Sequence, residues 1–214
     1  MAKAGPRPAA GPAGSGGRSA DTRAALISGA VAALREAGFS GASAREIGRR
    51  AGCNQALVFY HFGSVNDLLL AALDDISARR MAAYRGALDH AGTLTEVIES
   101  ARAIFVADLD AGHVRVLVEM ITGAQGVPGL GEQVAARLAP WREFARIAVQ
   151  RALASSPVAA VVPAGEIAHG VVAGFLGLEM LAQLDGDRSA ALALFDRALM
   201  LAGLLDLAGG LGLR

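Results

Sequence analysis

The chain has 214 residues, of which 53% are hydrophobic, and its 20 basic side chains balance 20 acidic ones. This length allows one large domain or two modest ones with a real core, and a net charge of zero excludes a uniformly basic coat for nucleic acid. A single cysteine, Cys53, excludes an intrachain disulfide and fits a reducing compartment.

The charge is unevenly distributed along the chain. Residues 1–62 carry eight basic and three acidic side chains, a net charge of +5, and residues 63–214 carry 12 basic and 17 acidic ones, a net charge of −5. Such asymmetry between two parts of a chain suggests that the first part meets a polyanion and the second does not.

Residues 1–20 are rich in Gly, Pro, Ala and Ser and carry three positive charges, so we predict a disordered basic tail. A basic arm that adds affinity for phosphate is the alternative. The tail has no apolar segment typical of a signal peptide. The most apolar stretch, 158–184, is interrupted by Pro163, Glu166, His169 and Glu179, so no membrane span is expected and the cytoplasm is the expected location.

Helical periodicity begins after the tail. Apolar residues on one face predict a helix over 22–37 that ends at Gly38. Ser43 and Glu46 have the spacing of a capping box, which predicts a helix over 44–51 that Gly52 stops. Asn54 can cap a further short helix over 55–61.

The remainder of the chain is also predicted to be helical. Capping patterns at Ser64–Asp67 and Thr93–Glu96 open helices through Met81 and to 109, and further helical patterns cover 113–124, 130–153, 164–184 and 188–207. No convincing alternating strand is present. The sequence therefore predicts an all-α fold.

Two short helices separated by a turn at 52–54 form a helix-turn-helix. Their apolar residues Ile47, Ala51, Val58 and Phe62 are spaced to pack against the helix at 22–37, which makes a three-helix unit. In such units the second helix enters the major groove of DNA with its first residues toward the bases. Arg49 and Arg50 would then contact phosphate or form a solvated face, and the sequence leaves both open.

A set of motifs in this region resembles the TetR family of transcriptional regulators. The matching residues are Gly38-Phe39, Ser43, Ile47-Gly48, Ala51-Gly52-Cys53-Asn54 and Val58-Phe59-Tyr60-His61-Phe62. The chain departs from the family pattern at Cys53, at Phe59 and at Val65, where a phosphate-contacting Lys is usual.

The resemblance implies an N-terminal three-helix helix-turn-helix DNA-binding domain at 21–75, and a C-terminal helical bundle at 76–214 that binds an effector and dimerises. The residues expected at DNA are Ser43, Arg45, Asn54, Gln55, Ala56, Leu57, Tyr60 and His61. Tyr60 and His61 are phosphate contacts by resemblance, and the alternative is that these helix-end rings pack on their own domain.

The last two predicted helices favour dimerisation. Small residues in 164–184 would let another backbone approach, and 188–207 is apolar almost all round, as expected of a buried helix. The expected interface residues are Gly170, Gly174, Gly177, Leu192, Phe195 and Leu199. The alternative is that both helices are buried only against their own chain.

Polar side chains that could anchor a small, largely apolar effector are Arg115, Glu119, Gln125, Trp141, Arg142 and His169. No metal or cofactor is expected, because His90, His113 and His169 lack partners at ligand spacing. Catalytic motifs such as Gly-x-Ser-x-Gly are missing, so we expect no enzyme.

We therefore predict a homodimeric repressor that binds double-stranded DNA at a palindromic operator and releases it when an effector binds. The alternative function is a non-specific DNA-binding architectural or adaptor protein of the same fold. A salt series distinguishes the two, because non-specific binding is almost entirely electrostatic.

Overall fold

The computed structural model describes residues 15–153 and 163–210. Within these ranges the chain forms α-helices and turns without a strand, which confirms the predicted all-α fold. The helices are α1 (Ser15–Gly41), α2 (Ala44–Ala51), α3 (Ala56–Phe62), α4 (Val65–His90), α5 (Leu94–Ala111), α6 (His113–Ala124), α7 (Leu130–Ala136), α8 (Ala139–Leu153), α9 (Ala164–Asp185) and α10 (Ser189–Gly210).

Two predicted boundaries are wrong. The predicted tail ends earlier, because α1 begins at Ser15 and residues 15–20 are helical; the prediction for 1–14 lies outside the described residues. Once the buried residues of α1 have nucleated the helix, each residue added at its start costs little. The predicted helix 130–153 is divided into α7 and α8. Pro140 lies in the first turn of α8, where a missing N–H is tolerated, but it could not continue a helix from α7.

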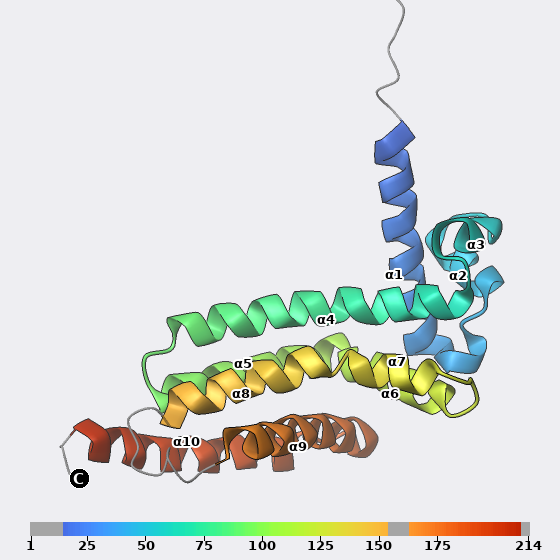
Figure 1. Cartoon of the computed structure of the whole chain (residues 1–214). Helices are drawn as coiled ribbons and strands as arrows, with labels where there is room; N and C mark the ends of the chain where they lie inside the picture. The colour runs from blue at the N-terminus through green and yellow to red at the C-terminus, as the bar shows by residue number, and fades with distance from the viewer. Residues whose placement is uncertain (1–14, 154–162, 211–214) are drawn as a thin grey trace, which may run out of the picture.

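The first three helices form a compact unit at one end of the long helix α4 (Figure 1). Leu26 and Leu34 of α1, Ile47 of α2 and Val58 of α3 are fully buried in one apolar cluster, and Ala51 and Phe62 pack against it. The predicted inward faces of the helix-turn-helix are thereby confirmed. Burial of such side chains, at about 1.5–3 kcal/mol each, holds this small unit together.

α4 connects this unit to the remaining helices, which lie along its length (Figure 1). It runs without interruption through residue 75, and the apolar cluster of the helix-turn-helix continues into Val116 and Met120 of α6 and Leu130 of α7. The expected boundary at 75/76 therefore lies inside a helix and not in a linker. A displacement of α4 would move α2 and α3 with it.

A second contact joins the first unit to α6. The helix α1 is interrupted at Gly38, as predicted, and the following Phe39 donates its backbone N–H to Oε2 of Glu119 at 2.9 Å. The Phe39 ring lies where a side chain at Gly123 would be, because a Cβ built there would be only 2.1 Å from the ring. Gly123 is therefore required for this close approach.

α9 and α10 present an apolar face to solvent. Its members are between 38% and 78% exposed, with Leu184 the most exposed of them: Ile167, Val171, Met180, Leu181, Leu184, Leu194, Met200, Leu201, Leu204 and Leu207. We call these residues the outer face. Many large apolar side chains exposed on two successive helices are unusual for the surface of a folded chain that has no partner.

Among the described residues, α9 has the length and composition of a helix that could cross a membrane, and α3 and α4 would qualify together but are bent by 67°. A single such helix is weak evidence, because core helices of soluble proteins share these properties. α9 also holds Glu179, which is fully buried and paired with Arg80 of α4.

Candidate DNA-binding surface and effector cavity

The turn between α2 and α3 is built as the sequence suggested. Ser43 caps α2 by accepting the N–H of Glu46 at 3.3 Å, and Gly52 ends that helix in the left-handed region, with φ of 64°. At the start of α3, Oδ1 of Asn54 accepts the N–H of Ala56 at 2.9 Å, as predicted for a capping side chain, while Gln55, which directly precedes the helix, makes no side-chain capping bond. The capping box is incomplete, since the Glu46 carboxylate is bonded to Arg49 and Arg50 and not to the backbone of Ser43.

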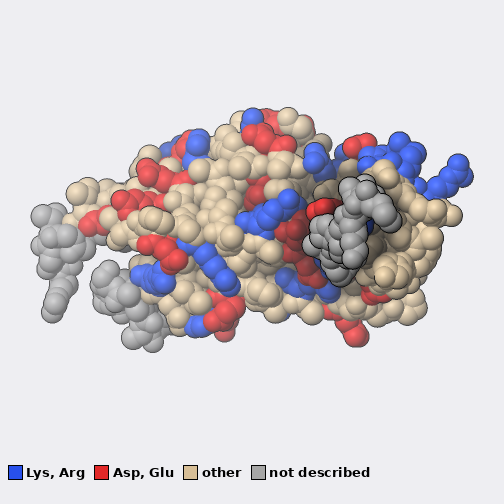
Figure 2. All heavy atoms as spheres, turned by 90° about the horizontal axis from the view of Figure 1, so that it is seen from above, with Lys and Arg blue, Asp and Glu red and all other residues tan. Residues whose placement is uncertain are grey.

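Most residues expected at DNA lie on one exposed surface. Arg45, Arg49, Asn54 and Gln55 surround a shallow hollow between α2 and α3, and Ser43 and Ala56 are exposed beside it. Basic side chains gather at this end of the molecule (Figure 2). We call these six residues the reading surface.

The aromatic end of α3 is exposed rather than packed. Tyr60 is 79% exposed and stacks edge-on against His61, which is half-buried. The alternative that Tyr60 packs on its own domain is therefore wrong. Phe59 is also 54% exposed, which the sequence did not indicate. Leu57 was expected at DNA, but it is half-buried against the core, because the turn of α3 that buries Val58 also rotates its neighbour inward.

Arg49 and Arg50 are held by carboxylates. Glu46 accepts from Nε and Nη2 of Arg49 at 2.9 and 2.7 Å and from Nε of Arg50 at 2.6 Å. Arg50 also donates to Glu36 of α1 at 2.6 Å, and its side chain is only 16% exposed. Hydrogen bonds from Arg49 and then Arg50 lower the pKa of Glu46 to about 2. Arg50 thus joins α1 to α2, whereas Arg49, 66% exposed, remains beside the reading surface.

Glu46→Gln should increase the affinity for DNA of any sequence. Without the carboxylate, the exposed guanidinium of Arg49 is free to contact phosphate, and each added contact should steepen the salt dependence by about 0.9 in the slope of log K against log salt. Glu143→Gln is the matched control, because it removes an exposed pair with Arg146 on α8, far from the reading surface. Fluorescence anisotropy across a salt series measures the slope, and an equal slope for both variants would contradict the expectation.

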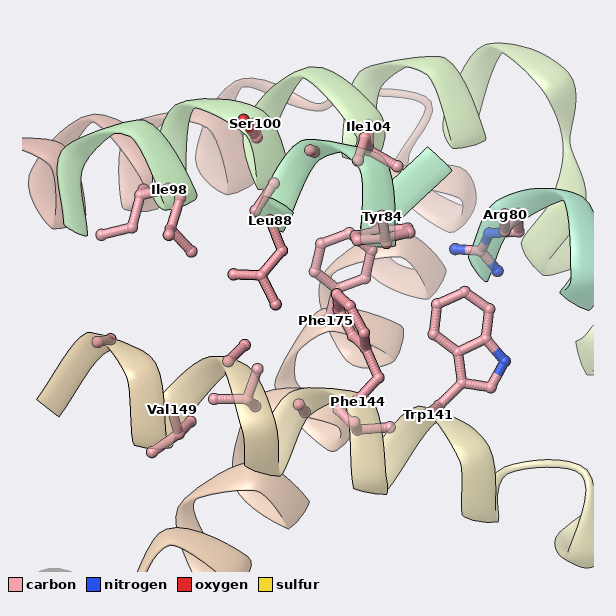
Figure 3. Close-up of a pocket in the computed structure, with 18 of the residues that line it drawn as sticks. Arg80, Tyr84, Leu88, Ile98, Ser100, Ile104, Trp141, Phe144, Val149 and Phe175 are labelled. Atoms are coloured by element: carbon pink, nitrogen blue, oxygen red, sulfur yellow. The ribbon is translucent and has the colours of Figure 1, made fainter. Parts of the chain in front are cut away.

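A cavity of about 440 Å³ lies between α4, α5, α8, α9 and α10. Aromatic rings surround one end of it, with Tyr84 edge-on to Trp141, Phe144 and Phe175 at 5.5–5.9 Å between centroids (Figure 3). Aliphatic side chains line the other end, including Ile98 and Val149. Cavities of this size and composition bind small apolar molecules.

A buried ionic cluster lies beside the aromatic end. Arg80 of α4 donates from Nε to Asp108 of α5 at 2.8 Å and from Nη2 to Glu179 of α9 at 3.1 Å. Tyr84 and His113 also contact Asp108, at 3.5 and 3.0 Å. Burial raises the pKa of Glu179 to about 8, although Arg80 acts against this change. The cluster joins α4, the helix that carries the DNA-binding unit, to α5 and α9.

The raised pKa of Glu179 predicts a pH-dependent stability. The unfolded chain releases this proton from about pH 4.5 upward, near the ordinary pKa of 4.5, while the folded chain keeps it until about pH 8. The contribution of Glu179 to stability is therefore complete below about pH 4.5 and decreases up to about pH 8. Glu179→Gln, which cannot ionise, should gain stability relative to the wild type between pH 5 and pH 8 in urea unfolding. Parallel stability profiles would contradict this assignment.

Only one of the six expected effector residues lines the cavity. Trp141 does, and its Nε1 donates to Ser77 of α4 at 2.8 Å. Glu119 instead accepts from Phe39, and the other four, Arg115, Gln125, Arg142 and His169, are exposed outside the cavity. Each lies on the solvent side of its helix. No sequence feature marked Arg80 as part of the cavity, although Glu179 interrupts the most apolar stretch of the chain.

The expected interface residues divide into two groups. Gly170 and Gly174 are exposed and Gly177 half-buried on α9, and a Cβ built at any of them would meet nothing within 4 Å. Leu192 and Phe195 pack instead against a cluster around Phe105 in the same chain, and Phe195 lines the cavity. Leu199 is half-buried. Leu192 and Phe195 point inward because α10 packs along α5, and the residues of the outer face are exposed instead.

Within the described ranges, no group of three or more His, Cys, Asp or Glu side chains is arranged to hold a metal ion. Cys53 lies half-buried in the turn, with Sγ 3.3 Å from the carbonyl oxygen of Ala51.

Residues 26–72 match the family model of bacterial regulatory proteins of the TetR family. No curated protein matches the chain in sequence. Among solved structures, a TetR transcriptional regulator from Chloroflexus aurantiacus is similar, with 21% identity, a TM-score of 0.69 and coverage of 86% of this chain and 94% of that one. The regulatory protein TetR from Rhodobacter sphaeroides has 17% identity, a TM-score of 0.68 and coverage of 83% and 96%.

The transcriptional regulator FadR from Bacillus subtilis, solved in complex with stearoyl-CoA, has 13% identity and a TM-score of 0.71, over 84% of this chain and 96% of that one. These likenesses extend over the helices beyond the matched N-terminal region, at identities that show the fold alone. The helix-turn-helix motif thus lies in a segment that matches the TetR family of bacterial regulatory proteins, and the chain shares its all-α architecture with these transcriptional regulators.

Proposed function

We propose that the protein is a homodimeric repressor of a palindromic operator, released by a small apolar effector. The observation that supports this most is that one continuous helix, α4, carries the helix-turn-helix at one end and lines the cavity at the other. An effector that favours a different position of α4 would change the spacing of the two reading surfaces in a dimer. The similar Bacillus subtilis protein, which was solved with stearoyl-CoA, offers a precedent for a bound molecule with a long apolar chain.

The outer face supports the dimer. It provides long apolar side chains on two neighbouring helices, and a second copy could cover them by forming a four-helix interface. Two DNA-binding units would then be available, as binding to a palindrome requires. A protein of this kind acts in the cytoplasm, without a metal, a cofactor or catalysis.

Selection of DNA from a random pool by the full-length protein tests this function. We expect an enriched palindrome whose half-sites are about one helical turn of DNA apart, or a multiple of it. Binding to the palindrome should retain a sequence-dependent part at high salt. Enrichment of no sequence would favour the non-specific architectural protein instead, because binding would then be entirely electrostatic.

Substitutions on α2 and α3 should separate phosphate contacts from base contacts. Tyr60→Phe and His61→Ala should weaken binding to specific and random DNA alike. Gln55→Ala and Arg45→Ala should change which base pairs are preferred, at about 1–3 kcal/mol for each lost contact. Anisotropy titrations with the selected palindrome, its single-base variants and random DNA measure both effects. Equal losses on all DNA for the four variants would refute the roles of Gln55 and Arg45.

A further inference from the structure

The cavity extends along α8 and has an almost entirely apolar lining. Its lining on α8 extends from Trp141 to Ala152, and at 1.5 Å per residue this distance is about 16 Å. Arg80 and Trp141 lie at one end and Ile98 and Val149 at the other (Figure 3). An extended apolar chain would fill it along this axis, with its end group at Arg80.

Arg80 is the single charged residue in the described lining of the cavity. Its charge is already balanced, because Asp108 and Glu179 accept from Nε and Nη2, and the guanidinium carbon lies 5.2 Å from the centre of the Trp141 ring. Tyr84, which also lines the cavity, is hydrogen-bonded to Arg80 as well. The guanidinium is therefore held by groups of its own chain, and the described lining at this end of the cavity has no uncompensated charge.

From this arrangement we propose that the effector is an uncharged molecule with an apolar chain that fills the cavity. This inference rests on the proposed role of the cavity as the effector site. A carboxylate would bring an unpaired negative charge to an arginine whose charge Asp108 already balances, and an ammonium group would meet Arg80 with no carboxylate in the lining. A buried charge without a partner is strongly disfavoured.

Trp141 makes the proposal directly testable, because it is the single tryptophan of the chain and lies at the charged end of the cavity. Its fluorescence can be titrated with methyl laurate, laurate and dodecylammonium, all below their critical micelle concentrations. Octyl and hexadecyl homologues extend the series to other lengths. We expect methyl laurate to bind more tightly than either charged probe by about tenfold or more.

Two variants make the test specific. Ala148→Phe places a ring in the middle of the lining and should abolish binding of every probe, while operator binding continues. Asp108→Asn removes the negative charge that balances Arg80 with little change of shape, so it should increase the affinity for laurate relative to methyl laurate. Circular dichroism confirms that each variant is folded before titration.

The possible outcomes are distinct. Preference for the neutral ester, lost in Ala148→Phe, supports the inference. Preference for laurate or dodecylammonium, also lost in Ala148→Phe, overturns the inference about charge but leaves the cavity as the effector site. If no probe binds, or if Ala148→Phe binds all of them unchanged, both the inference and the proposed role of the cavity are wrong. An operator-release assay with the bound probe then reports separately on repression.

Discussion

Leu204→Asp should convert the protein from a dimer to a monomer and abolish operator binding. Leu204 is 61% exposed in the middle of the outer face, and a carboxylate there would be buried without a partner when a second copy covers it. Loss of a central apolar contact in an interface costs about 2 kcal/mol or more, so association should weaken by at least roughly thirtyfold. Sedimentation equilibrium at micromolar concentration measures association, and anisotropy with the palindrome measures binding.

Gln183→Glu is the matched control, because it adds the same charge at an exposed polar position on α9 and should leave the dimer intact. Gly174→Leu provides a second test without charge. A Cβ at Gly174 would meet nothing within 4 Å in its own chain, so any weakening of association reports on the partner copy. A wild-type protein that is monomeric at micromolar concentration, or a Leu204→Asp variant that stays dimeric, would overturn the proposed interface.

Arg80→Met should lower the free energy of unfolding by about 3–5 kcal/mol. The substitution keeps most of the side-chain length but leaves the Asp108 carboxylate buried without its cation and Glu179 buried without its hydrogen-bond donor, and both side chains are at least 95% buried in the fold. Removal of one member of a buried ionic cluster exposes the full cost of desolvating the others. Urea unfolding of the two proteins at pH 7 measures the difference.

The adjacent residue gives the control for this prediction. Arg79 forms an ion pair with Asp75 on the surface of the same helix, and its side chain is 67% exposed. Arg79→Met should therefore change the stability by no more than about 1 kcal/mol. Similar losses for the two variants would show that the cluster around Arg80 does not differ in energy from a surface ion pair.

Local sequence determined the helix-turn-helix. Its caps at Ser43 and Asn54, the break at Gly52 and the apolar spacing of Ile47 and Val58 act over a few residues, and the structure shows each of them. Capping, glycine conformation and helical periodicity are short-range effects, so they can be read without knowing the fold. The resemblance to the TetR family came from the same short segment and was confirmed.

The effector cavity depended on long-range packing. Arg80 meets Asp108 and Glu179 across 28 and 99 residues of sequence, and Trp141 reaches Ser77 across 64. Periodicity showed that α4, α8 and α9 each have an apolar face, but not which faces would meet. In the structure the expected anchors Arg115, Gln125, Arg142 and His169 lie outside the cavity. A polar side chain alone does not indicate which way its helix is turned, so the sequence could not exclude them.

The outer face shows the same division between local and tertiary information. Sequence composition indicated that α9 and α10 are apolar enough to be buried. It did not indicate which of their residues pack inside their own chain and which remain exposed. Packing of α10 along α5 decided this, since it turned Leu192 and Phe195 into the chain and left Leu184 and Leu204 at the surface. A helix that is apolar on all sides has no preferred inward face of its own, so only its neighbours in the tertiary structure determine which residues remain exposed.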